Sequence, residues 1–532
     1  MAHITTYDTT LRDGGQCEGI NFSLNDKLLI ARALDDFGVD VIEGGFPASN
    51  PKDIAFFKAI ADEPFKHARL AAFGNTCKKG VAPEDDQGLK DLVESGAAIA
   101  TIVGKTWDEQ VTRALQTTLE ENLRMISDSV LYLKDCGMEV VFDAEHYFDG
   151  FISNEEYSLE CVRAAHEAGA DCICLCETNG GFLPFDVQRI CETTARKFPD
   201  QDFGIHCHND SGCAVANSLS AVKGGIVQVQ GTVNGIGERV GNTDLLTVIA
   251  DLELKMGLEA VGAHNLKELT HLSHYVAEVA GVKVDDHHPY SGRSAFAHKG
   301  GLHASAIARF PEAYEHSKPE LVGNSARMVV SELAGKASLI QKAADLGFDL
   351  TGDNADVQTI LDDIKAKEAA GYTFEAAEGS LALLIRRHLG EYEPLFTLES
   401  FRVVVDDRED TGALAKDAMS EATLKIWVDD ERSVAIGEGI GPVAALDEAI
   451  RKCIEPFYPA VADMELIDYK VRLPNESEGT EAITRVTITM EDRMGTYGTV
   501  GVSENVIEAS WNALVEALEY GLMRTESRES IR

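Results

Sequence analysis

The first half of the chain repeats one pattern, in which a short apolar run is followed by a longer stretch with apolar residues at helical spacing. Such a pattern is typical of parallel βα units. Eight units within roughly 260 residues predict a closed (β/α)8 TIM barrel, and an open doubly wound sheet is the alternative. The predicted strands cover residues 3–10, 39–46, 68–74, 98–105, 138–147, 170–178, 202–209 and 225–235, and two of the predicted helices cover 25–37 and 110–135.

The pattern changes twice after the barrel. Strand-like runs disappear over residues 265–392, which predicts helical linker subdomains. Alternating runs then return with two helical stretches, and this order predicts a separate α+β domain over residues 393–525. Glycine-rich stretches at 436–442 and 495–505 are expected to be turns before the two helices. We therefore expect three domains, the first of them a barrel over residues 1–264.

Charge narrows the range of partners. The 532 residues include 89 acidic and 48 basic ones, which gives a formal net charge of −41. This charge repels nucleic acids and anionic membranes, and the sequence has no basic cluster to override it. The sequence also has no apolar run near the ~20 residues that span a bilayer, and no signal-peptide pattern at its start. We expect a cytoplasmic protein without a nucleic-acid or membrane partner.

The eleven cysteines are predicted to be reduced and mostly buried. They include no CxxC pair, and Cys172, Cys174 and Cys176 alternate along a predicted strand. A thiolate metal site in this strand is the less favoured alternative.

Candidate metal ligands lie at the predicted carboxyl ends of strands, where barrel enzymes carry their reactive groups. His206 and His208 are one residue apart on a strand, so both imidazoles project to the same face. Asp13, after the first strand, would complete a site with two nitrogen ligands and one oxygen ligand. This set suits Mg²⁺, Mn²⁺, Zn²⁺ or Co²⁺ and does not choose among them. The metal ion would polarise a carbonyl group.

Arg12 is the candidate stabiliser of negative charge on a substrate oxygen, since it adjoins Asp13. The alternative is a simple ion pair, and Glu43 at the next strand end could hold Arg12 while Arg12 faces the substrate. Other polar residues at strand ends are Glu145, Thr178, Asn234, Glu238, Arg239 and Asn242, of which Asn242 is equally consistent with a helix cap.

These residues belong to motifs that resemble the signatures of the DRE-TIM metallolyase superfamily. The motifs are DTTLRDGGQ (8–16), IEGGFP (42–47), HCHND (206–210) and NGIGERVGN (234–242). The resemblance extends over nearly the whole chain to the 2-isopropylmalate, homocitrate and citramalate synthases, which share a barrel, helical linker subdomains and a C-terminal regulatory domain. Residues 8–28, 42–53 and 497–522 are most similar to the citramalate synthase branch.

The resemblance implies an acyltransferase that condenses acetyl-CoA with pyruvate and hydrolyses the product to citramalate and CoA, in the 2-oxobutyrate route to isoleucine. Alternatives are a sister synthase that uses a larger 2-oxo acid, an acyl-CoA lyase, or a non-catalytic amino-acid-sensing paralogue. The resemblance also implies a homodimer with isoleucine as feedback inhibitor, and a dimerisation module without a ligand is the alternative.

The resemblance assigns roles to particular residues. It implies Asp13, His206, His208 and Asn242 as metal ligands, and Arg12, Glu43 and Thr178 as substrate-binding residues. It implies Arg12, Glu145, His303 and Tyr314 as catalytic residues, with His298 as a rival for the role of His303.

Overall fold

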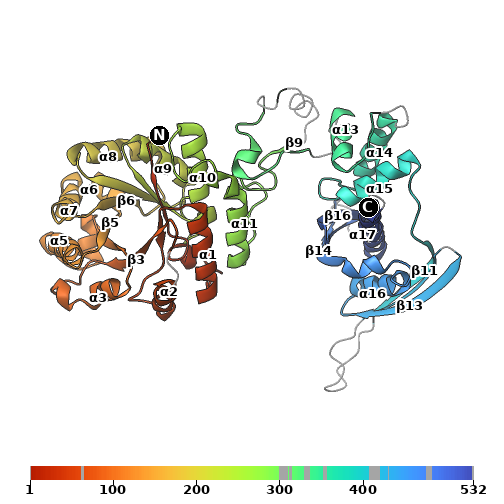
Figure 1. Cartoon of the computed structure of the whole chain (residues 1–532), viewed down its shortest axis with the longest axis horizontal. Coiled ribbons are helices and arrows are strands. Elements are labelled where there is room, and N and C mark those ends of the chain that lie inside the picture. Colours follow the sequence, from red (N-terminus) through yellow and green to blue (C-terminus); the bar gives the residue numbers. More distant parts are fainter. Residues whose placement is uncertain are drawn as a thin grey trace, which may run out of the picture. The chain divides into compact units, whose positions relative to one another are not determined.

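The computed structural model of the chain describes residues 2–61, 65–298, 310, 314–328, 336–351, 356–405, 420–428, 430–474 and 482–529. It divides into two compact units (Figure 1). One comprises Met1–Phe296 with His316–Ala326, and the other Ala297–Glu315 with Arg327–Arg532. The predicted division into three domains stays a prediction.

The first unit contains a closed barrel of eight parallel strands, so the predicted (β/α)8 architecture is confirmed. Each strand pairs with the next, and β8 closes the ring against β1. The alternative of an open sheet is therefore wrong. The strands are β1 (Thr5–Asp8), β2 (Val41–Glu43), β3 (Arg69–Asn75), β4 (Ile99–Lys105), β5 (Glu139–Glu145), β6 (Cys172–Glu177), β7 (Asp202–Cys207) and β8 (Gln228–Gly231).

Helices connect these strands (Figure 1). They are α1 (Leu24–Phe37), α2 (Pro51–Ala61), α3 (Gln87–Glu94), α4 (Asp108–Arg113), α5 (Leu119–Asp135), α6 (Tyr147–Ser153), α7 (Glu155–Glu167), α8 (Pro184–Lys197) and α9 (Ala214–Lys223), with α10 (Leu245–Asp251) and α11 (Leu269–Ala280) after β8. The prediction of one continuous helix over 110–135 is wrong. Gln116 takes a left-handed φ of 53°, and the Thr118 side chain accepts a hydrogen bond from the Glu121 N–H to begin α5.

Apolar side chains form a large core between the strands and the helices, and a smaller one inside the barrel. The inner core includes Cys172, Cys174 and Cys176, which therefore point into the barrel. All eleven cysteines are free and most are buried, as predicted. Burial raises the pKa of the Cys174 thiol well above its usual value, which keeps the thiol protonated. Asp143, Cys174 and Cys176 nevertheless offer ligand atoms within 4.8 Å of one another, so the thiolate metal site stays the less favoured alternative.

The second unit begins with two short strands that the sequence analysis did not expect. β9 (Ala297–His298) pairs in parallel with β10 (Arg327–Met328), so the predicted loss of all strands over 265–392 is wrong at this point. The helices α13 (Lys336–Asp345), α14 (Val357–Ala369) and α15 (Glu378–Leu389) follow and share an apolar core. That part agrees with the helical prediction.

The C-terminal part of this unit repeats one motif twice, three antiparallel strands followed by a helix, which confirms the α+β prediction. The first copy consists of β11 (Thr397–Val405), β12 (Ser420–Val428), β13 (Glu431–Gly439) and α16 (Pro442–Ile454). The second consists of β14 (Glu465–Arg472), β15 (Thr484–Asp492), β16 (Gly495–Ser503) and α17 (Val506–Glu529).

The glycine-rich stretches in this part are mostly strand, and the prediction of turns is wrong for β13 and β16. A Cβ atom on Gly437 would lie 2.2 Å from the carbonyl oxygen of Ala445, and one on Gly501 would lie 2.0 Å from that of Ala509. Glycine is needed because the following helix lies directly against the strand.

None of the helices among the described residues is long and apolar enough to cross a membrane. The cytoplasmic location stays a prediction.

Candidate active site

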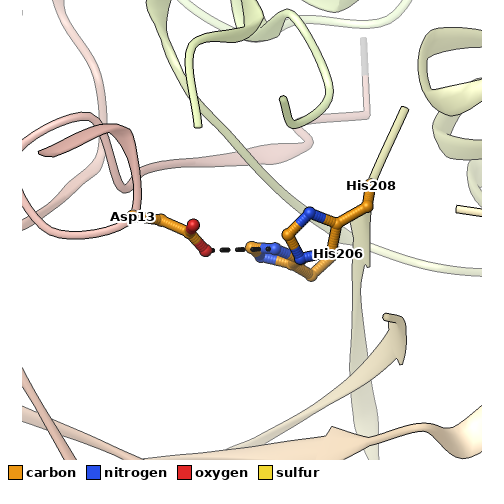
Figure 2. Close-up of side chains that lie close together, drawn as sticks. All are labelled: Asp13, His206 and His208. Atoms are coloured by element: carbon orange, nitrogen blue, oxygen red, sulfur yellow. Dashed lines mark ion pairs between the residues drawn. The ribbon is translucent and has the colours of Figure 1, made fainter. Parts of the chain in front are cut away.

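Asp13, His206 and His208 meet at the carboxyl end of the barrel (Figure 2). His206 lies on β7, and His208 is the first residue after that strand. Asp13 lies in the turn after β1. One ligand atom from each residue lies within 4.8 Å of the others, and Asp13 Oδ2 is 3.5 Å from His206 Nε2. All three side chains are buried. One divalent ion could bind all three side chains.

The protonation states of these side chains suit a metal ion. Burial opposes the ionisation of Asp13, but the positive charge of the adjacent Arg12 outweighs it and lowers the pKa of Asp13 to about 2. Burial, helped by the neighbouring His206, lowers the pKa of His208 to about 4. At neutral pH the site therefore offers a carboxylate and a neutral imidazole, the forms that bind metals.

Two buried polar atoms next to this cluster have no hydrogen-bond partner among the described residues, His208 Nδ1 and Asn242 Oδ1. Asn242 lies beside His208 because their backbones form an isolated antiparallel bridge. Leaving such an atom unsatisfied costs about 1–3 kcal/mol, and a bound ion would satisfy it. The donor set thus fits a divalent metal. Asp244 caps α10 with its own side chain, so the interpretation of Asn242 as that cap is wrong.

The loop after β8 is held in place by Arg239, a residue with a left-handed φ of 58°. Its Nε and Nη2 atoms each donate a hydrogen bond of 2.9 Å to a carboxylate oxygen of Asp210, and Nη2 also donates one of 2.9 Å to the carbonyl oxygen of Thr178. Within the loop, a Cβ atom on Gly237 would lie 2.2 Å from Asn242 Nδ2. Arg239 and this glycine together keep Asn242 close to His208.

Arg12 is fixed between two carboxylates. Its Nε donates a 2.5 Å hydrogen bond to Glu43, and its Nη1 donates one of 3.0 Å to Asp13. The guanidinium lies 3.9 Å from the centre of the Phe73 ring. Burial opposes the charge of Arg12, but Glu43 and Asp13 outweigh it and raise the pKa of Arg12 above its usual value. Arg12 is thus a permanent, oriented cation beside a candidate metal ligand.

Glu43 is fully buried and keeps its orientation through further hydrogen bonds, from the Tyr7 hydroxyl at 2.8 Å and from Thr9 Oγ1 at 2.5 Å. The two sequence interpretations of Arg12 were an ion pair with Glu43 and a stabiliser of charge on the substrate. The geometry is compatible with both at once.

Glu145 and Thr178 lie at the same end of the barrel, on β5 and directly after β6. Glu145 forms an ion pair with Lys105 and keeps 23% of its side chain exposed. Thr178 Oγ1 accepts a 2.9 Å hydrogen bond from the His146 N–H. Tyr314 belongs to the second unit and is 48% exposed, whereas His303 lies outside the described residues. His298, the rival for the role of His303, lies on β9.

A cavity of about 830 Å³ lies at the carboxyl ends of β3 and β4. Its lining includes Lys105, the partner of Glu145, and the exposed Lys78 and Lys79. These lysines were missed by the sequence analysis. Lys105 ends a strand and could have been found by the same rule that found Glu145, but Lys78 and Lys79 lie in a loop and carry no such signal.

Fold and site together define a (β/α)8 barrel protein with a candidate divalent-metal centre at the carboxyl end of the strands. Residues 3–276 match the HMGL-like family, 291–371 the homocitrate synthase post-HMGL domain-like family, and 375–522 the LeuA allosteric (dimerisation) domain.

The curated relatives are similar over nearly their whole length. The (R)-citramalate synthase of Aquifex aeolicus is 48% identical over 98% of this chain and 98% of its own, and that of Streptomyces coelicolor is 50% identical over 97% and 96%. A probable 2-isopropylmalate synthase of Methanopyrus kandleri is 32% identical over 97% of each chain. This chain belongs to the HMGL-like family and, within it, to the citramalate synthases.

Proposed function

We propose that this chain condenses acetyl-CoA with pyruvate and hydrolyses the resulting thioester to citramalate and CoA, in the 2-oxobutyrate route to isoleucine. The observation that carries the proposal is the 44–50% identity to five citramalate synthases. Identity to a probable 2-isopropylmalate synthase is only 32% over a similar length, which favours the smaller 2-oxo acid.

Asp13, His206, His208 and Asn242 are the proposed metal ligands, with Mg²⁺, Mn²⁺, Zn²⁺ and Co²⁺ all compatible with their chemistry. Bound there, the ion would supply Lewis-acid polarisation of the keto group of pyruvate.

Arg12 stabilises the negative charge that develops on the keto oxygen of pyruvate when C2 is attacked. The guanidinium donates hydrogen bonds to the keto oxygen as that oxygen gains negative charge, while Glu43 keeps it in place. The hydroxyl of Thr178 accepts from a backbone N–H, so its own proton can be donated to the pyruvate carboxylate. These two residues bind and orient the smaller substrate.

A base removes a proton from the methyl group of acetyl-CoA, a step to which general-base catalysis contributes ~10²–10⁴-fold. The proposed catalytic residues for this step are Glu145, His303 and Tyr314, and Lys105 keeps Glu145 oriented. The enolate carbon then attacks C2 and forms the new C–C bond, while the π electrons of the keto group move to its oxygen. That alkoxide takes up the proton removed from the methyl group. Water then cleaves the C–S bond of the thioester, which gives the free carboxylate and releases CoA.

The cavity lined by Lys78, Lys79 and Lys105 is the proposed place for the phosphate-bearing part of acetyl-CoA. Its lining combines these three lysines with two aspartates, Asp86 and Asp91, so the cavity is more basic than a chain with a net charge of −41. Lys105 connects the cavity to Glu145.

We expect the combined Lys78→Ala and Lys79→Ala variant to raise KM for acetyl-CoA about five- to thirtyfold with little change in kcat, because each lost ion pair is worth about 0.5–1 kcal/mol. Turnover of S-acetyl-N-acetylcysteamine, which has no phosphate, should not change. Lys90→Ala on α3 is the control, since that lysine does not line the cavity. An equal loss with both thioesters would contradict this placement.

The test of the proposed reaction is CoA release measured with a thiol reagent, together with mass spectrometry of the product. We expect CoA release to require pyruvate, acetyl-CoA and a divalent metal, and to match the citramalate formed. A chain that binds isoleucine but releases no CoA would instead be the amino-acid-sensing paralogue.

The C-terminal part of the second unit is the proposed site of dimerisation and feedback regulation, because residues 375–522 match the LeuA allosteric (dimerisation) domain. The outer face of its first sheet supports a dimer. There the apolar side chains of Trp427, Val434 and Ile436 are 40%, 50% and 51% exposed, enough to be buried against a second copy.

We expect isoleucine to lower the rate at least about fivefold, the lower range of allosteric coupling, and to raise the melting temperature. Alanine at the same concentration is the control. If isoleucine changes neither the rate nor the melting temperature, the result would favour a dimerisation module without a ligand.

A further inference from the structure

A buried polar chain runs from the candidate metal centre into the barrel. Gln230 on β8 lies directly beside His206 on β7 in the strand register. Its Oε1 is 3.0 Å from His206 Nδ1, and its Nε2 donates a 3.1 Å hydrogen bond to Asp143 Oδ1. Asp143 lies on β5, so the chain crosses the inside of the barrel. All three side chains are buried.

The orientation of the Gln230 amide sets the direction of the hydrogen bond to His206. Its nitrogen faces Asp143 Oδ1 and its oxygen faces His206 Nδ1. That oxygen can only accept, so Nδ1 of His206 carries the proton. The lone pair of His206 is then left on Nε2, the atom that lies 3.5 Å from Asp13 Oδ2.

We infer that Gln230 and Asp143 are positioning residues for His206, which fix its tautomer and ring orientation and thereby strengthen metal binding. The inference rests on the metal site of the proposed function. Hydrogen bonds to the second nitrogen of a metal-binding histidine commonly change metal affinity by about 10–100-fold. Both residues lie near the middle of the strands predicted over 225–235 and 138–147, so the search of predicted strand ends did not find them.

The test is the affinity of the full-length protein, stripped of metal, for Co²⁺, measured by calorimetry and by the visible absorption of the bound ion. Gln230→Leu should weaken binding about 10–100-fold and change the spectrum. Gln228→Leu is the matched control, because Gln228 is also buried and lies two residues earlier on the same face of β8. It should leave the affinity within about twofold, since it lacks the contact with His206.

A paired exchange tests the direction of the chain. Burial raises the pKa of Asp143 to about 7, so the exchange is measured above that pH. There, Gln230→Glu alone sets a carboxylate against the ionised Asp143 and should also weaken Co²⁺ binding. Adding Asp143→Asn restores a donor on β5 and an acceptor toward His206, so affinity should return to within about threefold of the parent. Thermal unfolding of the metal-free variants checks that each one folds. If Gln230→Leu does not fold, the inference is tested by the comparison of Gln230→Glu with the paired variant alone.

Two results would overturn this inference while leaving the metal site intact. The first is an equal affinity of the parent and Gln230→Leu for Co²⁺. The second is a paired variant that folds but binds Co²⁺ no more tightly than Gln230→Glu. A parent that binds no Co²⁺ would overturn the metal site of the proposed function, and the inference with it.

Discussion

Replacing Arg12 with lysine is expected to lower kcat by about 10²–10³-fold, the usual cost of losing one donor to a developing oxyanion. Lysine keeps the positive charge but not the planar fork through which Arg12 contacts both Glu43 and Asp13. One of those contacts, or the contact to substrate, must be lost. Steady-state kinetics with acetyl-CoA and pyruvate would measure the effect, and circular dichroism would check that the barrel remains folded.

Arg69→Lys is the matched control for this variant. Arg69 also pairs with a glutamate, Glu139, but both residues begin their strands and lie at the opposite end of the barrel. Its exchange should leave kcat within about twofold, as surface ion pairs are worth little. Near-normal turnover of Arg12→Lys would remove Arg12 from the catalytic residues.

The second large effect is expected from His208→Ala, which should lose the bound metal and at least about 10³-fold in turnover, roughly 4 kcal/mol. The variant removes one of only two imidazoles in the cluster and leaves Asp13 and His206 with an incomplete set of ligands. Metal content after dialysis, measured by plasma mass spectrometry, and the rate in excess metal would test both parts.

His166→Ala provides the control, since this half-buried histidine on α7 contacts Gln201 and does not belong to the cluster. It should keep both metal and activity. Unchanged metal content in His208→Ala would exclude His208 as a ligand.

The periodicity of the sequence predicted the barrel because every strand is a short buried run between amphipathic helices. The periodicity did not predict a helix boundary that no glycine or proline marks in the sequence. The break between α4 and α5 depends on a left-handed Gln116, a residue with no special preference for that conformation. It failed again at β13 and β16, since the glycines that let a helix lie against a strand look like turn residues in the sequence.

The candidate site was predictable as far as it lies at strand ends. Asp13, His206 and His208 were placed together from their strands alone, and they do meet in the structure. The contacts across the barrel were not predictable. Gln230 and Asp143 are distant in sequence and lie inside strands, where a polar residue gives no sign of its partner.

The central claim is that the 2-oxo acid is pyruvate, and the measurement that tests it most directly is kcat/KM for a panel of 2-oxo acids. CoA release would be followed with pyruvate, 2-oxobutyrate, 2-oxoisovalerate and 2-oxoglutarate at a fixed concentration of acetyl-CoA. We predict that pyruvate exceeds each larger acid by about tenfold or more, the usual value of one or more methylene groups in a pocket. A larger acid that reacts faster than pyruvate would contradict the claim.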